Sequence, residues 1–279
     1  MYQGSCSSRV LSSFVQVKMS LTGRTALVTG FGGGMGSAIA LSLAEAGCRI
    51  VGTDRSVSDT VKQNMEKIKE ISGQDALFFE CDLLNRESID HLCSTIASKV
   101  PSGIDILVNN AGCFERCTMD EKTPESWDKE LAINLTAPFL LSKNFVISMK
   151  KKGWGRIINM SSVVGLLSYP LTIGYCASKT GLVGLTKAIA AEMAPHGVTC
   201  NAICPYFVDT PIIQPVLDAL KRETGASREE SMENIRNTYP TKKFTTTKQI
   251  GDYVVFLCSP AADNMTGLAT PCDGGYSIV

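Results

Sequence analysis

The chain has 279 residues, 44% of them hydrophobic, which is enough for one large core or two small ones. With 27 basic and 27 acidic residues its formal net charge is zero, so no strong field favours nucleic acid or an anionic membrane. Its eleven cysteines and two histidines form neither a CxxC pair nor a cluster with zinc-ligand spacing, so we expect reduced intracellular thiols and no metal.

A small molecule is therefore the expected partner. No apolar run approaches the ~20 residues that a spanning helix requires, so no membrane span is expected. Residues 1–20 are rich in serine, carry Arg9 and Lys18, and contain no acid, which is typical of a mitochondrial presequence. This extension is short, however, and Met19 stands where a strand-first domain would begin. The expectations are a targeting or disordered extension and a cytoplasmic protein, with the mitochondrial matrix as the alternative.

From Arg24 onward, short runs of β-branched residues alternate with longer helical patterns, which predicts a parallel sheet with crossover helices. The seven predicted strands cover residues 25–29, 49–53, 76–81, 104–108, 156–160, 198–203 and 268–271. Long helices are predicted over 127–151 and 173–194. No repeat or proline-rich linker interrupts the pattern. Residues 21–279 are therefore predicted to form a single doubly wound (Rossmann) α/β domain with a mostly parallel sheet.

The first predicted strand leads directly into a glycine-rich loop, residues 29–36, and then into a helical pattern. Glycines allow positive φ angles and a close approach of a pyrophosphate, while the start of the helix offers free N–H groups to anionic oxygens. A plain glycine turn would look similar, but the order strand, loop, helix favours a nucleotide. The candidate cofactor residues in this loop are Gly30, Gly34, Met35 and Gly36.

Two acidic residues follow the next two strands. Asp54 is placed to accept hydrogen bonds from the hydroxyls of an adenosine ribose and to repel a 2′-phosphate, which favours NAD. Arg55 follows directly and is suited to a phosphate, so NADP is the alternative. Asp82 is placed to meet adenine, although a solvated loop aspartate has the same pattern. After the fourth strand, the run 109–112 offers small residues that pass beneath a cofactor: Asn109, Ala111 and Gly112.

Tyr175 and Lys179 stand four apart in a helical pattern, so both project from one face. A nearby ammonium favours the phenolate and is predicted to lower the pKa of the tyrosine toward the range of a general base. Ser162 lies beyond the end of the fifth strand, where its hydroxyl can hold a substrate oxygen. Residues 211–245 are polar, contain three prolines and follow the sixth strand, so they are predicted to form a mobile lid over the site.

At this point the chain resembles the short-chain dehydrogenase/reductase family, through TGxxxGMG (29–36), NNAG (109–112), Ser162 and YCASK (175–179). The resemblance covers about residues 19–279. It implies that Tyr175 is the acid/base and also contacts the cofactor, and that Lys179 lowers its pKa and binds the nicotinamide ribose. It further implies that Ser162 orients the substrate oxygen and that Asn134 holds a water for proton relay. It also implies that the protein forms a homotetramer. Two more residues are implied near the nicotinamide: Val208 and Thr210.

The segments 201–214 and 244–267 look most like bacterial-type 3-hydroxybutyrate dehydrogenases, but the expected substrate pocket differs. Tyr206 stands where the family usually has glycine. The positions of the polar and charged side chains that hold the hydroxy acid in those enzymes are occupied here by Phe114, Val164, Thr172 and Phe207. The predicted pocket, formed by Phe114, Val164, Tyr206 and Phe207, therefore favours an uncharged or apolar substrate. Cationic residues near the lid would rebuild a carboxylate site if closure brought one inward: Arg116, Lys221, Arg222, Lys242 and Lys243.

Together these features predict an NAD(H)-dependent oxidoreductase that interconverts a small secondary alcohol and a ketone. One alternative is an NADP-linked reductase of a bulkier apolar carbonyl, which depends on Arg55. The other is a catalytically idle NAD-binding protein, for which Tyr206 is the sequence hint. Simple oxidation of NADH with a panel of ketones distinguishes an enzyme from an idle protein.

Overall fold

The computed structural model describes residues 20–279. The prediction of a targeting or disordered extension over residues 1–20 therefore lies outside the described residues, apart from Ser20. The predicted domain, residues 21–279, falls entirely within them.

The centre of the molecule is a seven-stranded sheet in which every neighbouring pair of strands is parallel. The predicted doubly wound fold is confirmed, and the sheet is wholly rather than mostly parallel. Its strand order is β3-β2-β1-β4-β5-β6-β7. The strands are β1 Thr25–Thr29, β2 Arg49–Asp54, β3 Leu77–Glu80, β4 Ile106–Asn109, β5 Gly155–Met160, β6 Val198–Pro205 and β7 Ala269–Cys272. The order reverses between β1 and β4, where the carboxyl ends of the strands leave a crevice for a ligand.

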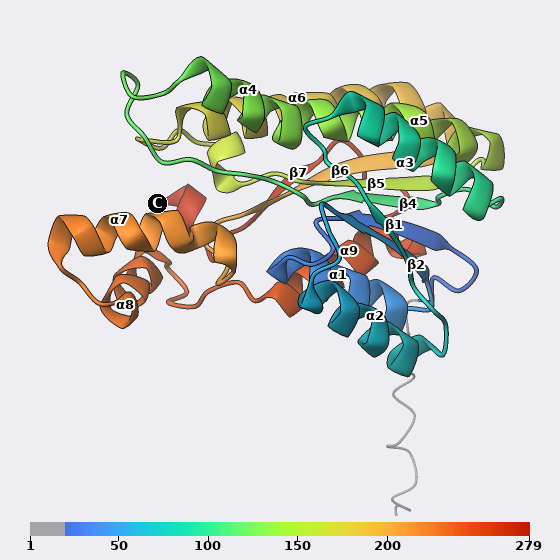
Figure 1. The fold of residues 1–279 in the computed structure, drawn as a ribbon, viewed down its shortest axis with the longest axis horizontal. Coiled ribbons are helices and arrows are strands. Elements are labelled where there is room, and N and C mark those ends of the chain that lie inside the picture. Colours follow the sequence, from blue (N-terminus) through green and yellow to red (C-terminus); the bar gives the residue numbers. More distant parts are fainter. Residues whose placement is uncertain (1–19) are drawn as a thin grey trace, which may run out of the picture.

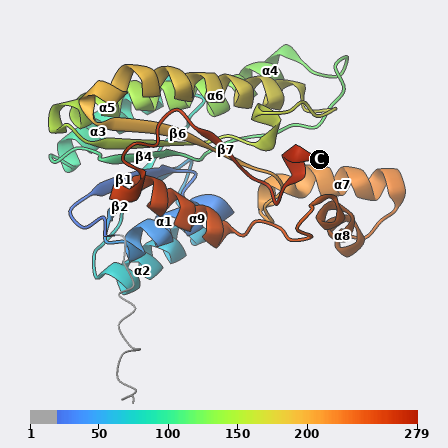
Figure 2. The same ribbon diagram turned by 180° about the vertical axis from the view of Figure 1, so that it is seen from behind.

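Helices cover both faces of the sheet, as Figures 1 and 2 show. One face carries α1 Gly34–Glu45, α2 Asp59–Ser72 and α9 Thr247–Cys258. The other carries α3 Arg86–Lys99, α5 Ala137–Lys152 and α6 Ile173–Met193. Two buried apolar cores result, one on each face, because the strands are apolar on both sides.

The helix predicted over 127–151 is longer and is not uniform. It begins as α4 Pro124–Leu131, passes through a π-helical turn at Ala132–Thr136, and continues as α5. Thr123 ends the preceding loop by accepting the N–H of Ser126 at 3.2 Å, and Pro124 fits the first turn because it needs no N–H partner there. The π turn holds Asn134, one of the predicted catalytic residues.

Within residues 20–279, the helical stretch Pro124–Lys152 is long and apolar enough to cross a membrane by length and composition alone. The expectation that no stretch has this property is wrong. One side of it packs into the core between the sheet and helices α3, α5 and α6 through Leu141, Phe145 and Met149. Helices that cover a sheet share this composition, so the stretch is weak support for a span, and the absence of one stays a prediction.

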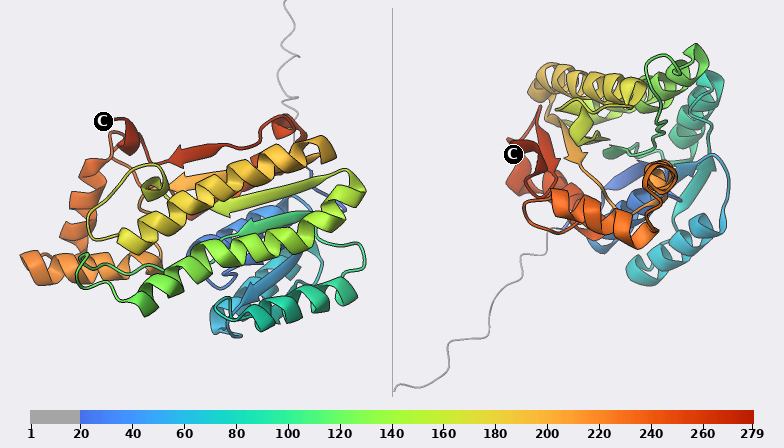
Figure 3. Two further views of the ribbon diagram at one scale, coloured as in Figure 1. Left: turned by 90° about the horizontal axis from the view of Figure 1, so that it is seen from above. Right: turned by 90° about the vertical axis from the view of Figure 1, so that its left-hand side faces the viewer.

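The segment 211–245 contains two helices, α7 Gln214–Thr224 and α8 Arg228–Thr238. Ser227 and Glu230 form a reciprocal cap at the start of α8, and Gly225, at φ +72°, ends α7. The two helices share a small apolar cluster around Leu217, Ile235 and Tyr239. Figure 3 shows them beyond one end of the sheet, next to the C-terminal segment. They therefore lie where a lid over the crevice would lie, and the mobility of this lid stays a prediction.

Candidate active site

The turn from β1 into α1 is shaped for a close approach of another group. Gly30 has φ +66°, and a Cβ atom on Gly36 would lie 2.1 Å from the Gly30 carbonyl oxygen, so both positions require glycine. Gly33 precedes α1 without any side chain that caps the helix. The first N–H groups of α1 are therefore available to an anion.

Beside this turn lies a cavity of about 480 Å³, which we call the cofactor cavity. Nine of the predicted cofactor residues line it: Gly30, Gly34, Met35, Gly36, Asp54, Asp82, Ala111, Gly112 and Thr210. The Asp54 carboxylate is fixed there, because Oδ2 accepts the N–H of Gly32 at 3.0 Å and Oδ1 accepts the N–H of Arg55 at 2.8 Å. Arg55 also lines the cavity, so the acidic and basic groups both lie where an adenosine ribose would bind.

Four predicted cofactor residues do not line this cavity: Asn109, Tyr175, Lys179 and Val208. Asn109 is the last residue of β4, and its side chain points into the protein, where Nδ2 donates to Asn159 Oδ1 at 2.8 Å. Val208 is buried and lines neither this cavity nor the substrate cavity described below. Asn110, which was not among the predicted cofactor residues, does line the cofactor cavity. Side chains alternate along a strand, so the residue after Asn109 is the one turned toward the crevice.

Asn110 is held in place by the end of β1, the neighbouring strand. Its Nδ2 donates to the Thr29 carbonyl at 2.9 Å, and the Thr29 hydroxyl accepts the N–H groups of Asn110 and Ala111, each at 3.0 Å. The buried Oδ1 of Asn110 has no hydrogen-bond partner among the described residues. The uncapped start of α1 on the wall of this cavity fits the phosphates of a bound dinucleotide.

A second cavity of about 400 Å³, the substrate cavity, adjoins the first at Ile212, which lines both. The four residues of the predicted pocket all line it: Phe114, Val164, Tyr206 and Phe207. Ser162 and Tyr175 line it too. The Phe114 ring meets the Tyr175 ring edge-on, with centroids 5.1 Å apart. Tyr206 is stacked on Tyr276 of the C-terminal turn, with centroids 3.8 Å apart. The wall around the phenol is thus mainly aromatic and aliphatic.

Tyr175 and Lys179 lie on the first turns of α6, where Lys179 is buried and Tyr175 is partly exposed to the cavity. The Lys179 Nζ lies 5.5 Å from the centroid of the Tyr175 ring and donates to the Met160 carbonyl at 2.7 Å. Burial lowers the pKa of Lys179 to about 8. Burial also raises the pKa of Tyr175 above its usual value, although a hydrogen bond with Ser162 lowers it in part. The predicted fall in the pKa of the tyrosine is therefore wrong for this structure, because desolvation disfavours the charged form of each group.

Asn134 lies beside this group rather than on the phenol. Its Nδ2 donates to the Cys113 carbonyl at 2.9 Å and to Ser178 Oγ at 3.0 Å, while Oδ1 accepts the N–H of Cys113 at 2.9 Å. A Cβ atom on Gly112 would lie 3.2 Å from Asn134 Oδ1 and 3.5 Å from Lys179 Nζ, so the three groups meet. Both amide hydrogens of Asn134 are used by protein partners, and its part in a water relay stays a prediction.

Of the cationic residues suggested near the lid, all within residues 20–279, Arg116 lines the substrate cavity and the other four do not. Its Nη1 pairs with Glu223 Oε1 of α7 at 2.7 Å, with 24% of the Arg116 side chain exposed. The guanidinium therefore joins the loop after β4 to the lid and is already paired with a carboxylate.

No group of three or more His, Cys, Asp and Glu side chains suited to a metal occurs in the part of the chain that the structure describes. The ten cysteines within residues 20–279 are free. Burial raises the pKa of the thiols in both closely spaced pairs, at Cys113, Cys117, Cys200 and Cys204. These thiols are therefore protonated at neutral pH and are poor metal ligands in that form.

A doubly wound parallel sheet with a glycine-lined cofactor cavity, beside a cavity-lining tyrosine and serine and a buried lysine, defines a dinucleotide-dependent oxidoreductase that acts on an alcohol or carbonyl. The chain belongs to the short-chain dehydrogenase family, whose model, described as short chain dehydrogenase, matches residues 24–221.

Known relatives resemble the chain over nearly its whole length. A D-beta-hydroxybutyrate dehydrogenase from Rhizobium meliloti is 35% identical over 255 residues, which cover 91% of this chain and 98% of that protein. A solved structure described as an NAD(P)-dependent gluconate 5-dehydrogenase from Beutenbergia cavernae, with bound NADP, has a TM-score of 0.83 and 34% identity, covering 93% and 98% of the chains. The L-sorbose reductase of Gluconobacter frateurii, complexed with NADPH and L-sorbose, has a TM-score of 0.88 and 28% identity, covering 94% and 99%.

Proposed function

We propose that the protein is an NAD(H)-dependent oxidoreductase that interconverts a secondary alcohol and a ketone in the substrate cavity. The observation that carries this proposal is the position of Tyr175 and Ser162, which line an apolar cavity directly next to the cofactor cavity. Lys179 lies buried behind the tyrosine. A dinucleotide in the cofactor cavity supplies or accepts a hydride, and the chain supplies the proton chemistry and the binding site.

The residues of the cofactor cavity divide the binding of the dinucleotide among them. Gly30, Gly36 and the start of α1 receive the pyrophosphate, Asp54 accepts from the adenosine ribose, and Asp82 lies toward the adenine. The Asn110 to Gly112 turn and Thr210 flank the part nearest the substrate cavity.

In the reduction direction, Tyr175 donates its phenolic proton to the carbonyl oxygen, which Ser162 orients by a hydrogen bond. The raised pKa of Tyr175 keeps the phenol protonated and therefore ready to act as an acid. In the oxidation direction the same oxygen must accept a proton, and a cationic Lys179 stabilises the charge that develops on it. Because burial brings the pKa of Lys179 to about 8, its charge changes as the pH passes through about 8.

The direct test is the oxidation of NADH with a panel of uncharged ketones. We expect NADH to be consumed with at least one of them. Binding of NADH without turnover of any member of the panel, in either direction, would instead identify a nucleotide-binding protein without catalytic activity.

Replacing Asp54 by alanine is expected to relax the preference for NAD over NADP by about tenfold in kcat/KM, which corresponds to ~1.4 kcal/mol. The reason is that an acceptor for the ribose hydroxyls and a charge that repels a 2′-phosphate are lost together. Steady-state kinetics with both cofactors measures the ratio, and Arg55→Ala is the matched control, expected to weaken NADP rather than NAD. A wild-type enzyme that prefers NADPH contradicts the proposed cofactor.

The substrate cavity is expected to favour a neutral, largely apolar alcohol over free 3-hydroxybutyrate. Phe114, Val164 and Phe207 offer no hydrogen bond to a carboxylate, and Arg116 is already paired with Glu223. A carboxylate that leaves water without a partner loses several kcal/mol, and every ~1.4 kcal/mol is tenfold in affinity.

Steady-state kinetics with 3-hydroxybutyrate, its methyl ester and an apolar secondary alcohol checks this preference. Glu223→Gln is an informative control, because it frees Arg116 and should improve the free acid relative to the ester. A tenfold or larger advantage of the free acid in kcat/KM in the wild-type enzyme shows that the cavity is built for the hydroxy acid.

A further inference from the structure

The loop after β4 runs as an extended segment, residues 113–117, along the edge of the substrate cavity. The backbones of its odd-numbered residues form hydrogen bonds: Cys113 with the side chain of Asn134, Glu115 N–H with Glu130 Oε1 at 2.9 Å, and Cys117 N–H with the Leu171 carbonyl at 3.2 Å. The even-numbered side chains, Phe114 and Arg116, line the cavity. This alternation is that of a strand, so the backbone anchors on one side determine where the cavity wall lies on the other.

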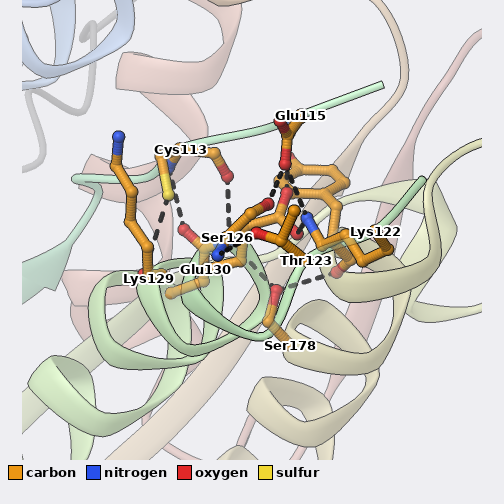
Figure 4. A network of polar contacts seen from close by, with 10 residues as sticks. Cys113, Glu115, Lys122, Thr123, Ser126, Lys129, Glu130 and Ser178 are labelled. Carbon is orange, nitrogen blue, oxygen red and sulfur yellow. Dashed lines mark hydrogen bonds and ion pairs between the residues drawn. The ribbon is translucent and has the colours of Figure 1, made fainter. Parts of the chain in front are cut away.

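The central anchor, Glu130, belongs to a buried ion pair that joins this segment to α4. Lys122 Nζ lies 2.6 Å from Glu130 Oε2 and 3.1 Å from Glu115 Oε2, and only 5% of the Lys122 side chain and 2% of the Glu130 side chain are exposed. The Ser126 hydroxyl also donates to the Glu115 carboxylate. Figure 4 shows Glu115, Lys122, Ser126 and Glu130 as one connected network beside Cys113.

The same carboxylate touches the helix that carries the tyrosine. A Cβ atom on Gly174 would lie 2.2 Å from Glu130 Oε2, so the first turn of α6 packs directly against the ion pair. Tyr175 is the next residue. Glu130 therefore contacts both elements that carry Phe114 and Tyr175. The centroids of these two rings lie 5.1 Å apart.

We propose that Lys122 and Glu130 are positioning residues that fix Phe114 relative to Tyr175 and so set which substrates fit beside the phenol. An ion pair this deeply buried adds little stability over apolar side chains of the same size, because both charges lose their water. What apolar side chains cannot replace is the acceptor for the Glu115 amide. The effect on substrate choice rests on the proposed function, whereas the effect on the position of the segment does not.

The variant Lys122→Met/Glu130→Leu removes the charges together, and so avoids leaving a single buried charge, while it deletes the anchor of Glu115. Lys152→Met/Asp105→Leu is the matched control. Asp105 is also a buried carboxylate that accepts a backbone N–H, from Thr25 at 2.9 Å, and pairs with a lysine at 2.8 Å. It lies directly before β4, at the amino ends of the parallel strands, whereas the cavities lie at their carboxyl ends. Glu130→Gln is the conservative variant, because it keeps an oxygen for the Glu115 amide.

Hydrogen exchange by mass spectrometry gives a measurement that is independent of activity. We expect exchange of the peptide that spans 113–117 to accelerate at least ~10-fold in the double variant, less in Glu130→Gln, and not in the Asp105 control. Unchanged exchange shows that the pair does not hold the segment, and equal acceleration in the control shows that it acts only on overall stability; either result overturns the proposal.

Kinetics supplies the second measurement, the ratio of kcat/KM for 4-phenyl-2-butanol to that for 2-propanol. The double variant is expected to change this ratio at least ~10-fold with NADH binding unchanged, and to add nothing further when Phe114 is already alanine, because both changes act through the same side chain. A ratio equal to that of wild type, or effects that add to those of Phe114→Ala, overturns the proposal. A wild-type protein that oxidises no alcohol contradicts the proposed function instead, and the exchange measurement still decides the positioning role.

Discussion

Replacing Tyr175 by phenylalanine is expected to lower turnover at least ~100-fold while the affinity for NADH stays within about twofold of wild type. The phenol is the group on the wall of the substrate cavity that is placed to exchange a proton with the reacting oxygen, and phenylalanine keeps its shape without that proton. A loss of this size corresponds to ~2.7 kcal/mol of transition-state stabilisation. Initial rates with saturating substrate and fluorescence titration of NADH measure the two quantities.

Tyr169→Phe is the matched control, because Tyr169 lines the same cavity and has a phenol that takes no part in the proposed chemistry. This variant is expected to retain near-normal turnover. If Tyr175→Phe also turns over at the wild-type rate, another group supplies the proton and the assignment of Tyr175 is wrong.

Lys179→Met is expected to abolish most activity and yet to stabilise the folded protein at neutral pH. Burial lowers the pKa of Lys179 from 10.5 to about 8, so the folded state holds the charged lysine at a cost below pH 8. A shift of this size corresponds to an upper limit of ~3.4 kcal/mol, reduced by loss of the hydrogen bond to the Met160 carbonyl. Methionine has a similar length and carries no charge.

The pH dependence has a definite sign. Between pH 8 and 10.5 the unfolded chain binds more protons at this lysine than the folded protein, so this group makes wild-type stability rise with pH in that window. The stability advantage of Lys179→Met is therefore largest at or below pH 8 and shrinks toward pH 10.5. Urea unfolding at several pH values between 7 and 9.5 measures it, with Lys187→Met, an exposed lysine on the same helix, as the control. A variant that is less stable than wild type at pH 7 contradicts the expectation.

Local patterns in the sequence were sufficient for the sheet and the cofactor cavity. The β-branched runs located all seven strands to within about two residues, and the spacing from Gly30 to Gly36 and Asp54 followed from the geometry of a strand, turn and helix. These features depend on residues that are close in the sequence, or on the rule that ligands bind at the carboxyl ends of parallel strands.

What the sequence did not reveal depends on the third dimension. The sequence does not distinguish Asn109 from Asn110, because both are short polar residues. The direction of each side chain is set by where β4 ends. The pKa of Tyr175 depends on how deeply α6 is buried, which no spacing of residues reports. Glu130 and Lys122 look like ordinary charges of an exposed helix and loop until the fold places them under α6.

The ion pair between Arg116 and Glu223 makes the rim of the substrate cavity sensitive to salt, unlike its apolar wall. About half of the Glu223 side chain is exposed, at 51%, so dissolved ions can reach this pair. Screening acts over about 8 Å at physiological ionic strength and weakens such contacts further as salt is added. The interior of the cavity binds through apolar contact, which salt leaves largely unchanged, whereas the attachment of α7 to the loop after β4 is ionic. Added salt is therefore expected to weaken the attachment of α7 at the opening of the cavity, while apolar binding in its interior stays largely unchanged.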